Sequence, residues 1–312
     1  MQMPKLVTVI GGSGFIGRQV VQDLARAGIR VRVGCRDPEA ALSLKTMGDV
    51  GQVTPVQVNI RDEASVRAAV QGADAVVNLV GILAEGGKQR FQTVQGEGPG
   101  ILARAAAAAG ATALVQVSAI GASAESPAAY ARSKAMGEKA VRDAFPDAVV
   151  LRPSIVFGPR DSFFNMFAEL ARLSPALPLI GGGATRFQPV YVGDVAAAVM
   201  AALTKPGARG KTYELGGPAI YSFKELLQMM LRETGQKVCL ISLPFPVASL
   251  VGALTGWLPG APLTADQVAL LKSDNVVSAG AEGLAELGVA PTAIQAVLPS
   301  YMDVYRKGGR FA

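Results

Sequence analysis

The stretch that decides the fold joins an apolar run, Leu6-Val-Thr-Val-Ile10, directly to a glycine-rich turn, Gly11-Gly-Ser-Gly-Phe-Ile-Gly17. A helical pattern follows over residues 16–27. In such a unit the first glycine permits a tight turn, the second lets backbone N–H groups approach a pyrophosphate, and the third allows the helix to pack closely on the strand. The positive end of the helix then faces the phosphates. The turn predicts a dinucleotide site, with an ordinary glycine-rich βα turn as the alternative.

Six residues of this turn are expected to form the phosphate cradle: Gly11, Ser13, Gly14, Phe15, Ile16 and Gly17.

Short β-branched runs alternate with longer helical patterns through the first two-thirds of the chain. The runs that predict strands are residues 6–10, 30–34, 53–58, 75–79, 114–118 and 148–153. The patterns that predict helices are residues 16–27, 65–71, 98–109 and 129–144. Strict alternation with short glycine-containing joints is typical of parallel βαβ units. The sequence therefore predicts an α/β fold with a Rossmann-type doubly wound parallel sheet.

The regular alternation of predicted strands and helices ends at about Gly158. We predict an NAD(P)-binding domain over residues 1–157 and a smaller C-terminal lobe over residues 158–312, with segments of the lobe returning to the sheet. Further helices are expected over residues 163–173, 195–203 and 222–234, and extended segments over 187–192 and 212–215. Asp194 stands where an N-cap belongs.

Composition excludes several classes of protein. The 312 residues carry 30 Lys and Arg against 24 Asp and Glu, an excess that is spread along the chain and does not imply nucleic acid. The sequence contains no histidine, which argues against an imidazole base and against a metal site. Cys35 and Cys239 form no disulfide framework, so a reducing compartment is expected. No signal peptide precedes the first strand, which predicts an intracellular protein.

One stretch, residues 238–265, contains 28 residues without a charge. Its prolines leave only residues 247–258 as a clean helical segment, too short for the ~20 residues that span a bilayer. Two placements of this stretch remain open. It can be buried within the small lobe, or it can form an apolar surface that contacts a partner or a membrane.

The end of the second predicted strand, Val33-Gly-Cys-Arg-Asp37, bears on which nucleotide binds. An acidic residue here hydrogen-bonds the ribose hydroxyls and selects NAD, whereas an arginine suits the 2′-phosphate of NADP. Arg36 occupies the position and Asp37 follows it. We favour NADP(H) over NAD(H), the alternative being that Arg36 is solvated and Asp37 meets the ribose.

Residues after the third and fourth predicted strands are expected to complete the cofactor site. Asn59 and Ile60 would border the adenine, and Val80 and Gly81 would line the ribose.

Tyr130 and Lys134 stand four residues apart near the start of a predicted helix, so they share one face. An ammonium beside a phenol favours the phenolate. Such a tyrosine can exchange a proton with a carbonyl while nicotinamide exchanges a hydride.

With these motifs the chain resembles the extended short-chain dehydrogenase/reductases. The glycine turn, the Tyr130/Lys134 pair and Leu151-Arg-Pro-Ser-Ile-Val-Phe-Gly158 carry the resemblance over nearly the whole length. It implies that Lys134 also holds the nicotinamide ribose, and that Pro153 and Ile155 border the nicotinamide.

The resemblance also implies a hydroxyl that polarises the substrate carbonyl, two residues past the first serine at the end of the fifth strand. Ser118 is present, but the expected hydroxyl position holds Ile120. Ser123 could substitute if its loop folds back. The catalytic set is therefore expected to be incomplete.

Longer phrases resemble one narrower family, the alpha-subcomplex subunit 9 proteins, which are NADPH-binding accessory subunits of respiratory complex I. They are Tyr130-Ala-Arg-Ser-Lys-Ala-Met-Gly-Glu138, Phe157-Gly-Pro-Arg-Asp-Ser-Phe-Phe-Asn165 and Gln188-Pro-Val-Tyr-Val-Gly-Asp194. The resemblance implies complex I subunits as partners, a peripheral position on the cytoplasmic or matrix side of the inner membrane, and no established turnover. Contact with the membrane surface is expected through residues 238–265.

Two other functions stay open. The first is an NADP(H)-dependent reductase of a lipophilic carbonyl such as a quinone precursor, with Tyr130 as proton donor and Lys134 as modulator of its pKa. The second is a redox-sensing regulator whose partner changes with nucleotide occupancy.

Overall fold

The computed structural model describes residues 3–255 and 263–309. The chain forms two compact units, each assembled from three segments. The first unit comprises Met1–Pro153, Gly193–Leu215 and Gly280–Ala290, and the second comprises Ser154–Val192, Gly216–Ala279 and Pro291–Ala312. The division into functional domains at residue 157 stays a prediction.

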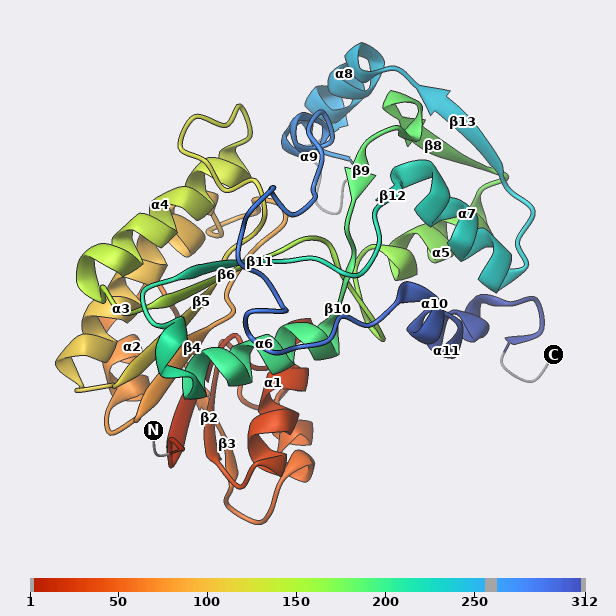
Figure 1. Ribbon diagram of the computed structural model, residues 1–312. Helices are drawn as coiled ribbons and strands as arrows, with labels where there is room; N and C mark the ends of the chain where they lie inside the picture. The colour runs from red at the N-terminus through yellow and green to blue at the C-terminus, as the bar shows by residue number, and fades with distance from the viewer. Residues whose placement is uncertain (1–2, 256–262, 310–312) are drawn as a thin grey trace. The chain divides into compact units, whose positions relative to one another are not determined.

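The first unit is built on a seven-stranded parallel sheet (Figure 1). In spatial order its strands are β11 (Thr212–Leu215), β6 (Val149–Pro153), β5 (Ala113–Val117), β4 (Ala75–Asn78), β1 (Leu6–Ile10), β2 (Arg30–Cys35) and β3 (Val53–Gln57). Strands β4 and β5 are buried along their whole length, as expected where helices cover both faces of a parallel sheet. The predicted fold class is confirmed.

Helices cover both faces of this sheet. On one face lie α2 (Glu63–Val70), α3 (Gly98–Ala108) and α4 (Ala129–Ala144), and on the other lie α1 (Phe15–Arg26) and α6 (Val192–Thr204) (Figure 1). The prediction of Asp194 as an N-cap is wrong, because α6 already begins at Val192. Asp194 lies in the first turn instead, where the helix dipole favours a carboxylate.

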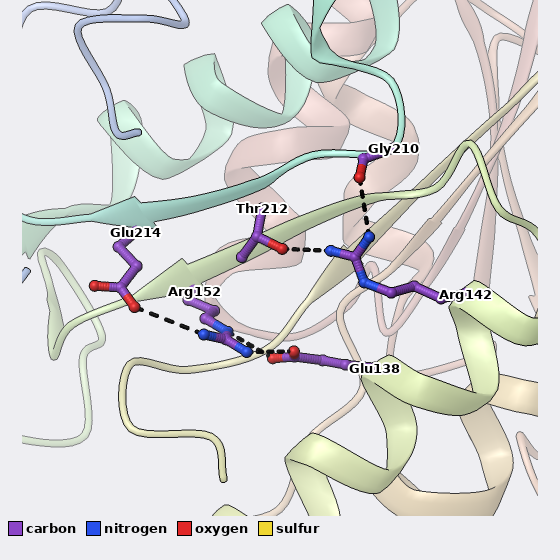
Figure 2. Close-up of polar contacts among 6 residues, drawn as sticks. All are labelled: Glu138, Arg142, Arg152, Gly210, Thr212 and Glu214. Atoms are coloured by element: carbon purple, nitrogen blue, oxygen red, sulfur yellow. Dashed lines mark hydrogen bonds and ion pairs between the residues drawn. The ribbon is translucent and has the colours of Figure 1, made fainter. Parts of the chain in front are cut away.

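An ion pair ties α4 to β6, and a hydrogen bond ties it to β11 (Figure 2). Glu138 on α4 accepts two hydrogen bonds from Arg152 on β6, at 2.9 and 2.7 Å. Glu214 on β11 lies 3.7 Å from the same guanidinium. Arg142, one turn further along α4, donates to the hydroxyl of Thr212 on β11. The helix that carries Tyr130 and Lys134 is thus fixed to the sheet by directional contacts.

The variant Arg152→Lys should measure how much the two parallel hydrogen bonds between Arg152 and Glu138 contribute to the free energy of unfolding. Lysine keeps the charge but cannot make the two parallel hydrogen bonds, so we expect a loss of about 1–2 kcal/mol in the free energy of unfolding. The exposed pair of Arg67 and Glu63 provides the control. Arg67→Lys should cost less than about 0.5 kcal/mol in the same urea titration. Equal losses would mean that the Arg152 network contributes no more than a surface pair.

The second unit contains three two-stranded sheets. They pair β7 (Val156–Phe157) with β10 (Val190–Tyr191), β9 (Arg186–Phe187) with β12 (Tyr221–Ser222), and β8 (Ala176–Ile180) with β13 (Cys239–Leu243). Its helices are α5 (Phe164–Leu173), α7 (Phe223–Thr234), α8 (Phe245–Thr255), α9 (Ala265–Leu270), α10 (Ile294–Val297) and α11 (Pro299–Met302). Its core combines leucines with phenylalanines, the latter being Phe157, Phe164, Phe187 and Phe223. Strand β13 was not predicted.

Local capping explains where α7 begins and ends. Ser222 and Glu225 form a reciprocal capping box at its first turn. Gly235, with φ of +65°, ends the helix in the left-handed conformation that favours glycine.

Helix α8 buries small residues and exposes large ones. Ala248 is fully buried, whereas four side chains at i, i+3, i+4 and i+7 are exposed. We call these the apolar stripe: Val247, Leu250, Val251 and Leu254. The helix starts two residues before the predicted segment because Pro246 is tolerated in a first turn. The remainder of that segment, from residue 256 on, lies outside the described residues.

Within residues 3–255 and 263–309, no helix combines the length and the apolar character needed to cross a membrane.

Candidate functional site

The glycine turn, residues 11–17, forms a backbone cradle at the carboxyl end of β1. Gly11 has a φ of +81°, and its N–H donates to the carbonyl of Gly34 on β2 at 2.8 Å. A Cβ on Gly17 would lie 2.4 Å from the carbonyl oxygen of Gly11, so no side chain fits there. A Cβ on Gly14 would meet only that same oxygen, at 3.2 Å. Gly17 therefore serves packing, whereas Gly14 faces the open side of the cradle.

Helix α1 starts directly from this turn, with Gly14 as its N-cap. No side chain caps it, and its first turn contains no acidic residue. The first N–H groups of a helix have no partner within the helix, and the helix dipole adds positive potential there. The backbone of Ser13, Phe15 and Ile16 is thus available to an anion, and the turn fits a pyrophosphate group.

The end of β2 presents Arg36 to solvent. Arg36 is exposed, and no hydrogen bond or ion pair joins it to another described residue. The carboxylate of Asp37 instead accepts from the N–H groups of Glu39 and Ala40, at 3.0 and 3.3 Å. Asp37 therefore closes a local turn, while Arg36 can reach a ligand.

The two residues predicted after β3 have different surroundings. The side chain of Asn59 accepts from the N–H and from Nε of Arg61, both at 3.2 Å. Ile60 is only 6% exposed and packs against Gly98, at the start of α3.

The loop after β4 leads to the predicted catalytic pair. The N–H of Val80 donates to the side chain of Asn78 at 3.1 Å. A Cβ on Gly81 would lie 3.2 Å from Nζ of Lys134, so the glycine leaves room for the ammonium. Residues predicted from separate motifs, Gly81 and Lys134, are thus neighbours.

Tyr130 and Lys134 lie together on α4, as the spacing predicted. Nζ of Lys134 is 5.8 Å from the centre of the Tyr130 ring. Lys134 is 6% exposed, and its burial lowers the pKa of the ammonium from 10.5 to about 8, against the opposing attraction of Glu138. The ring of Phe91 meets Tyr130 edge-on at 5.9 Å. A buried, destabilised ammonium beside a phenol is a functional-site candidate.

A π-helical segment, η2 (Gln92–Glu97), precedes α3 and supports the helical turn that carries Tyr130 and Lys134. It was not predicted from the sequence. Its Gln95 is 1% exposed; it accepts from the N–H of Ile82 at 3.2 Å and donates to the hydroxyl of Ser133 at 2.9 Å. That hydroxyl donates to the carbonyl of Tyr130 at 2.7 Å. The hydrogen-bond partners of Gln95 are distant in sequence, and the residues around it are themselves mostly polar, so nothing in the local sequence singled it out.

A hydroxyl side chain, Ser118, and an apolar side chain, Ile120, follow the end of β5. Ser118 is 4% exposed, and its Oγ is one of the buried polar atoms in the described chain that have no hydrogen-bond partner. Ile120 is also buried, and its N–H donates to the carbonyl of Pro153 at 3.1 Å. The loop does fold back, because the N–H of Ser123 donates to the carbonyl of Ala131 at 3.3 Å.

The side chain of Ser123 has a local partner: its Oγ accepts from the N–H of Glu125 at 3.3 Å.

Ile155 belongs to the second unit, where its N–H donates to the side chain of Asn275 at 3.1 Å. The catalytic and cofactor-binding roles predicted for these residues, and for the other site residues predicted from the sequence, stay predictions.

Residues 7–216 match the sequence pattern of the NAD dependent epimerase/dehydratase family. The chain belongs to this family. A relative from Arabidopsis thaliana, NADH dehydrogenase [ubiquinone] 1 alpha subcomplex subunit 9, mitochondrial, is 38% identical over 97% of the chain and 79% of its own length. The narrower resemblance seen in the sequence is therefore confirmed.

Other members of the epimerase/dehydratase family are also similar. A ceramide reductase from Caulobacter vibrioides is 30% identical over 80% of the chain and 77% of its own length. Among solved structures, the dTDP-glucose 4,6-dehydratase DesIV from Streptomyces venezuelae, solved with NAD and TYD bound, superposes with a TM-score of 0.73 at 21% identity. Each chain is covered to 95%, which establishes the shared fold.

Membership in the epimerase/dehydratase family supports a nucleotide cofactor and a fold of the NAD(P)-dependent oxidoreductase type. The geometry agrees with a dinucleotide in two respects. The cradle opens at Gly14, where a side chain would enter the space that a pyrophosphate needs, and a buried hydroxyl, Ser118, lacks a partner.

Proposed function

We propose that this chain is an NADP(H)-binding accessory subunit of respiratory complex I, with little or no turnover of its nucleotide. The proposal rests on a well-formed nucleotide cradle in a chain that has a buried isoleucine, Ile120, where the family resemblance calls for a hydroxyl. A site that can hold a nucleotide but lacks one of the hydroxyls that polarise a carbonyl is suited to binding. The relative from Arabidopsis thaliana, named as a complex I subunit, supports the same function.

The nucleotide would act on stability. It would contact both the glycine turn and the end of β2. Because these segments come together only on folding, the nucleotide would bind the folded state and not the unfolded chain. A ligand at a hundred times its Kd stabilises the folded state by about 2.7 kcal/mol. Its presence would hold the first unit in the form that assembles with complex I subunits.

We further propose NADP(H) over NAD(H) as the nucleotide. Arg36 is exposed at the end of β2 without a partner among the described residues, and Asp37 uses its carboxylate to cap a turn. An arginine in this position can form a forked hydrogen bond to a 2′-phosphate. One oxygen of the Asp37 carboxylate, which would bind ribose hydroxyls in an NAD site, is already used in this turn.

Arg36→Ala tests the nucleotide choice. We expect the Kd for NADPH to rise about tenfold to a hundredfold, since a charge-assisted hydrogen bond is lost. The Kd for NADH should change less than about threefold, because NADH has no 2′-phosphate. Calorimetric titration of both nucleotides checks this. An equal loss for both would contradict the assignment of Arg36 to the phosphate.

For location we propose a peripheral protein on the cytoplasmic side of the inner membrane, or the matrix side in a mitochondrion. The uncharged stretch, residues 238–265, would touch the membrane surface through the apolar stripe on α8. Exposed apolar side chains in one helical face can insert into the headgroup region without spanning the bilayer.

Replacing Leu250 and Leu254 of the stripe with glutamate tests that contact. We expect the fraction that sediments with phosphatidylcholine and phosphatidylglycerol vesicles to fall at least about threefold, because charged groups resist insertion. Leu173→Glu on α5 is the control, as Leu173 is 86% exposed but outside the stripe. Equal losses for both would argue against a specific membrane face.

Affinity isolation from gently solubilised native membranes tests the subunit function. The expected result is recovery at endogenous expression with stoichiometric NADH:quinone oxidoreductase subunits and bound NADP(H). Tyr130→Phe should leave that recovery unchanged. Recovery from the soluble fraction, free of those subunits but with nucleotide bound, would contradict the proposal.

A second candidate function is reduction of a lipophilic carbonyl. It is favoured by the unpartnered Oγ of Ser118 and by the ceramide reductase of Caulobacter vibrioides. A bound nicotinamide would supply the hydride. Tyr130 would donate its phenolic proton to the carbonyl oxygen, Lys134 would lower the pKa of that tyrosine, and Ser118 would donate a hydrogen bond to the same oxygen. NADPH oxidation with lipophilic ketones and quinones, lost in Tyr130→Phe, would establish this function.

A further inference from the structure

We propose that Arg18 on α1 is a second specificity-determining residue, which together with Arg36 clamps the 2′-phosphate of NADP(H). This inference rests on the proposed binding of NADP(H). Arg18 follows the last glycine of the turn, outside the residues expected to form the cradle.

The glycine turn lies against the end of the strand that carries Arg36. The N–H of Gly11 donates to the carbonyl of Gly34 on β2 at 2.8 Å. A Cβ on Gly12 would lie 2.9 Å from the side chain of Val33. Burial raises the pKa of the thiol of Cys35, the residue before Arg36, and the side chain of Ser13 lies close enough to that thiol to oppose the shift. Ser13 is therefore the part of the turn nearest to the predicted 2′-phosphate site.

The guanidinium of Arg18 is held at that same part of the turn. Its Nε donates to the carbonyl oxygen of Ser13 at 3.1 Å. The backbone N–H of Arg18 donates to the carbonyl of Gly14 at 3.0 Å, which fixes the first turn of α1 beneath the side chain. One edge of the guanidinium is thereby used and its direction is set, so little rotational freedom remains to be lost when a ligand binds.

The other two nitrogens of Arg18 are available. Neither Nη1 nor Nη2 has a hydrogen bond or an ion pair with a described residue, and the side chain is half-buried. Nearby carboxylates do not compete for it. The first turn of α1 has no acidic residue, and Asp37 caps its own turn. Arg18 is thus held at Ser13, Arg36 follows Cys35, and neither guanidinium has an ion-pair partner among the described residues.

A phosphate monoester suits this arrangement better than ribose hydroxyls do. It has three acceptor oxygens and nearly two negative charges near neutral pH, so it can accept from two guanidinium groups at once. A ribose 2′-hydroxyl has neither the charge nor enough acceptor positions for two arginines. Arg18 should therefore contribute to the difference between NADP(H) and NAD(H), and little to the affinity that the two nucleotides share.

The test uses the full-length protein, freed of nucleotide, and calorimetric titration with NADPH and with NADH. In Arg18→Met we expect the Kd for NADPH to rise at least about tenfold, and the Kd for NADH to change less than about threefold. The double variant Arg18→Met/Arg36→Met should bind the two nucleotides with nearly equal Kd. Arg26→Met, in the last turn of α1 with a 68% exposed side chain, is the matched control and should change neither Kd.

The outcomes separate the inference from the proposed function. A wild-type protein that prefers NADPH, with an Arg18→Met variant that keeps the full preference, overturns the clamp and leaves the function standing. Equal weakening of NADPH and NADH also overturns it, because Arg18 would then only shape the turn through Ser13. A wild-type protein that binds neither nucleotide, or prefers NADH, removes the proposed cofactor itself. Thermal unfolding of each variant without nucleotide verifies that the fold is intact.

Discussion

Gly14→Val should abolish nucleotide binding while leaving the fold intact, whereas Gly17→Ala should strongly destabilise the first unit. Gly14 has an extended backbone, with φ of −73° and ψ of 179°, that valine adopts readily. A Cβ there would meet only the carbonyl oxygen of Gly11, at 3.2 Å. Its branched methyl groups would project into the open side of the cradle, where the pyrophosphate must approach the backbone.

Gly17 faces the interior of the turn instead. A Cβ there would lie 2.4 Å from the Gly11 carbonyl oxygen and 2.6 Å from two backbone atoms of Gly12. These are backbone atoms and cannot rotate away, so the turn must separate from α1. Overpacking of a rigid core costs about 1–3 kcal/mol or more, a large part of the stability of a small domain.

Urea unfolding and nucleotide titration of both variants check the contrast. For Gly14→Val we expect a loss of about 1 kcal/mol in unfolding free energy, because valine is a poorer N-cap than glycine and its Cβ would lie 3.2 Å from the Gly11 carbonyl oxygen. The Kd for both NADPH and NADH should rise at least about a hundredfold. Gly207→Ala controls for the loss of a glycine, since a Cβ there meets no atom within 4 Å and the backbone of Gly207 does not have a positive φ. Tight binding by Gly14→Val would mean that the pyrophosphate lies elsewhere.

Most of the fold was predictable because its signals are local. The strands of the first unit are short β-branched runs, and β1, the glycine turn and α1 follow one another without interruption. Burial on both faces makes such strands uniformly apolar, which is visible in the sequence. The pairing of Tyr130 with Lys134 was equally local, since four residues on a helix fix their common face.

The features that escaped prediction depend on contacts between distant segments. Gln95 joins the loop at Ile82 to Ser133 on α4, and nothing near residue 95 in the sequence indicates those partners. Strand β13 forms only because β8 lies beside it; its own residues are mostly exposed and show no alternation. The engagement of Asp37 in its own turn likewise depends on backbone geometry that composition does not reveal.

Glu138 links the two groups of polar contacts on α4. It accepts both hydrogen bonds of Arg152 (Figure 2). It also attracts the ammonium of Lys134, one turn earlier on the helix. Because Arg152 already neutralises it, Glu138 compensates Lys134 only in part. The buried ammonium therefore remains costly in the absence of a ligand.

Lys134→Met should accordingly stabilise the nucleotide-free protein and weaken nucleotide binding. Burial lowers the pKa of Lys134 from 10.5 to about 8, so the folded chain holds this proton less tightly than the unfolded chain does. At pH 7 both states are protonated, and the full penalty, on the order of 3 kcal/mol, opposes folding. Methionine has a similar volume and no charge, so the free energy of unfolding should rise by up to that amount.

The advantage of methionine should disappear as the pH rises. Between pH 8 and 10.5 the folded protein loses the proton while the unfolded chain keeps it, so the wild-type protein gains stability relative to the variant. Above pH 10.5 both states are neutral and the difference should vanish. Urea titrations at pH 7, 9 and 10.5, compared with Lys139→Met at an exposed position of the same helix, measure this. A difference that does not change with pH would show that the ammonium is not destabilised by burial. Loss of stability at pH 7, with NADPH affinity retained, would instead make Lys134 a structural residue of α4.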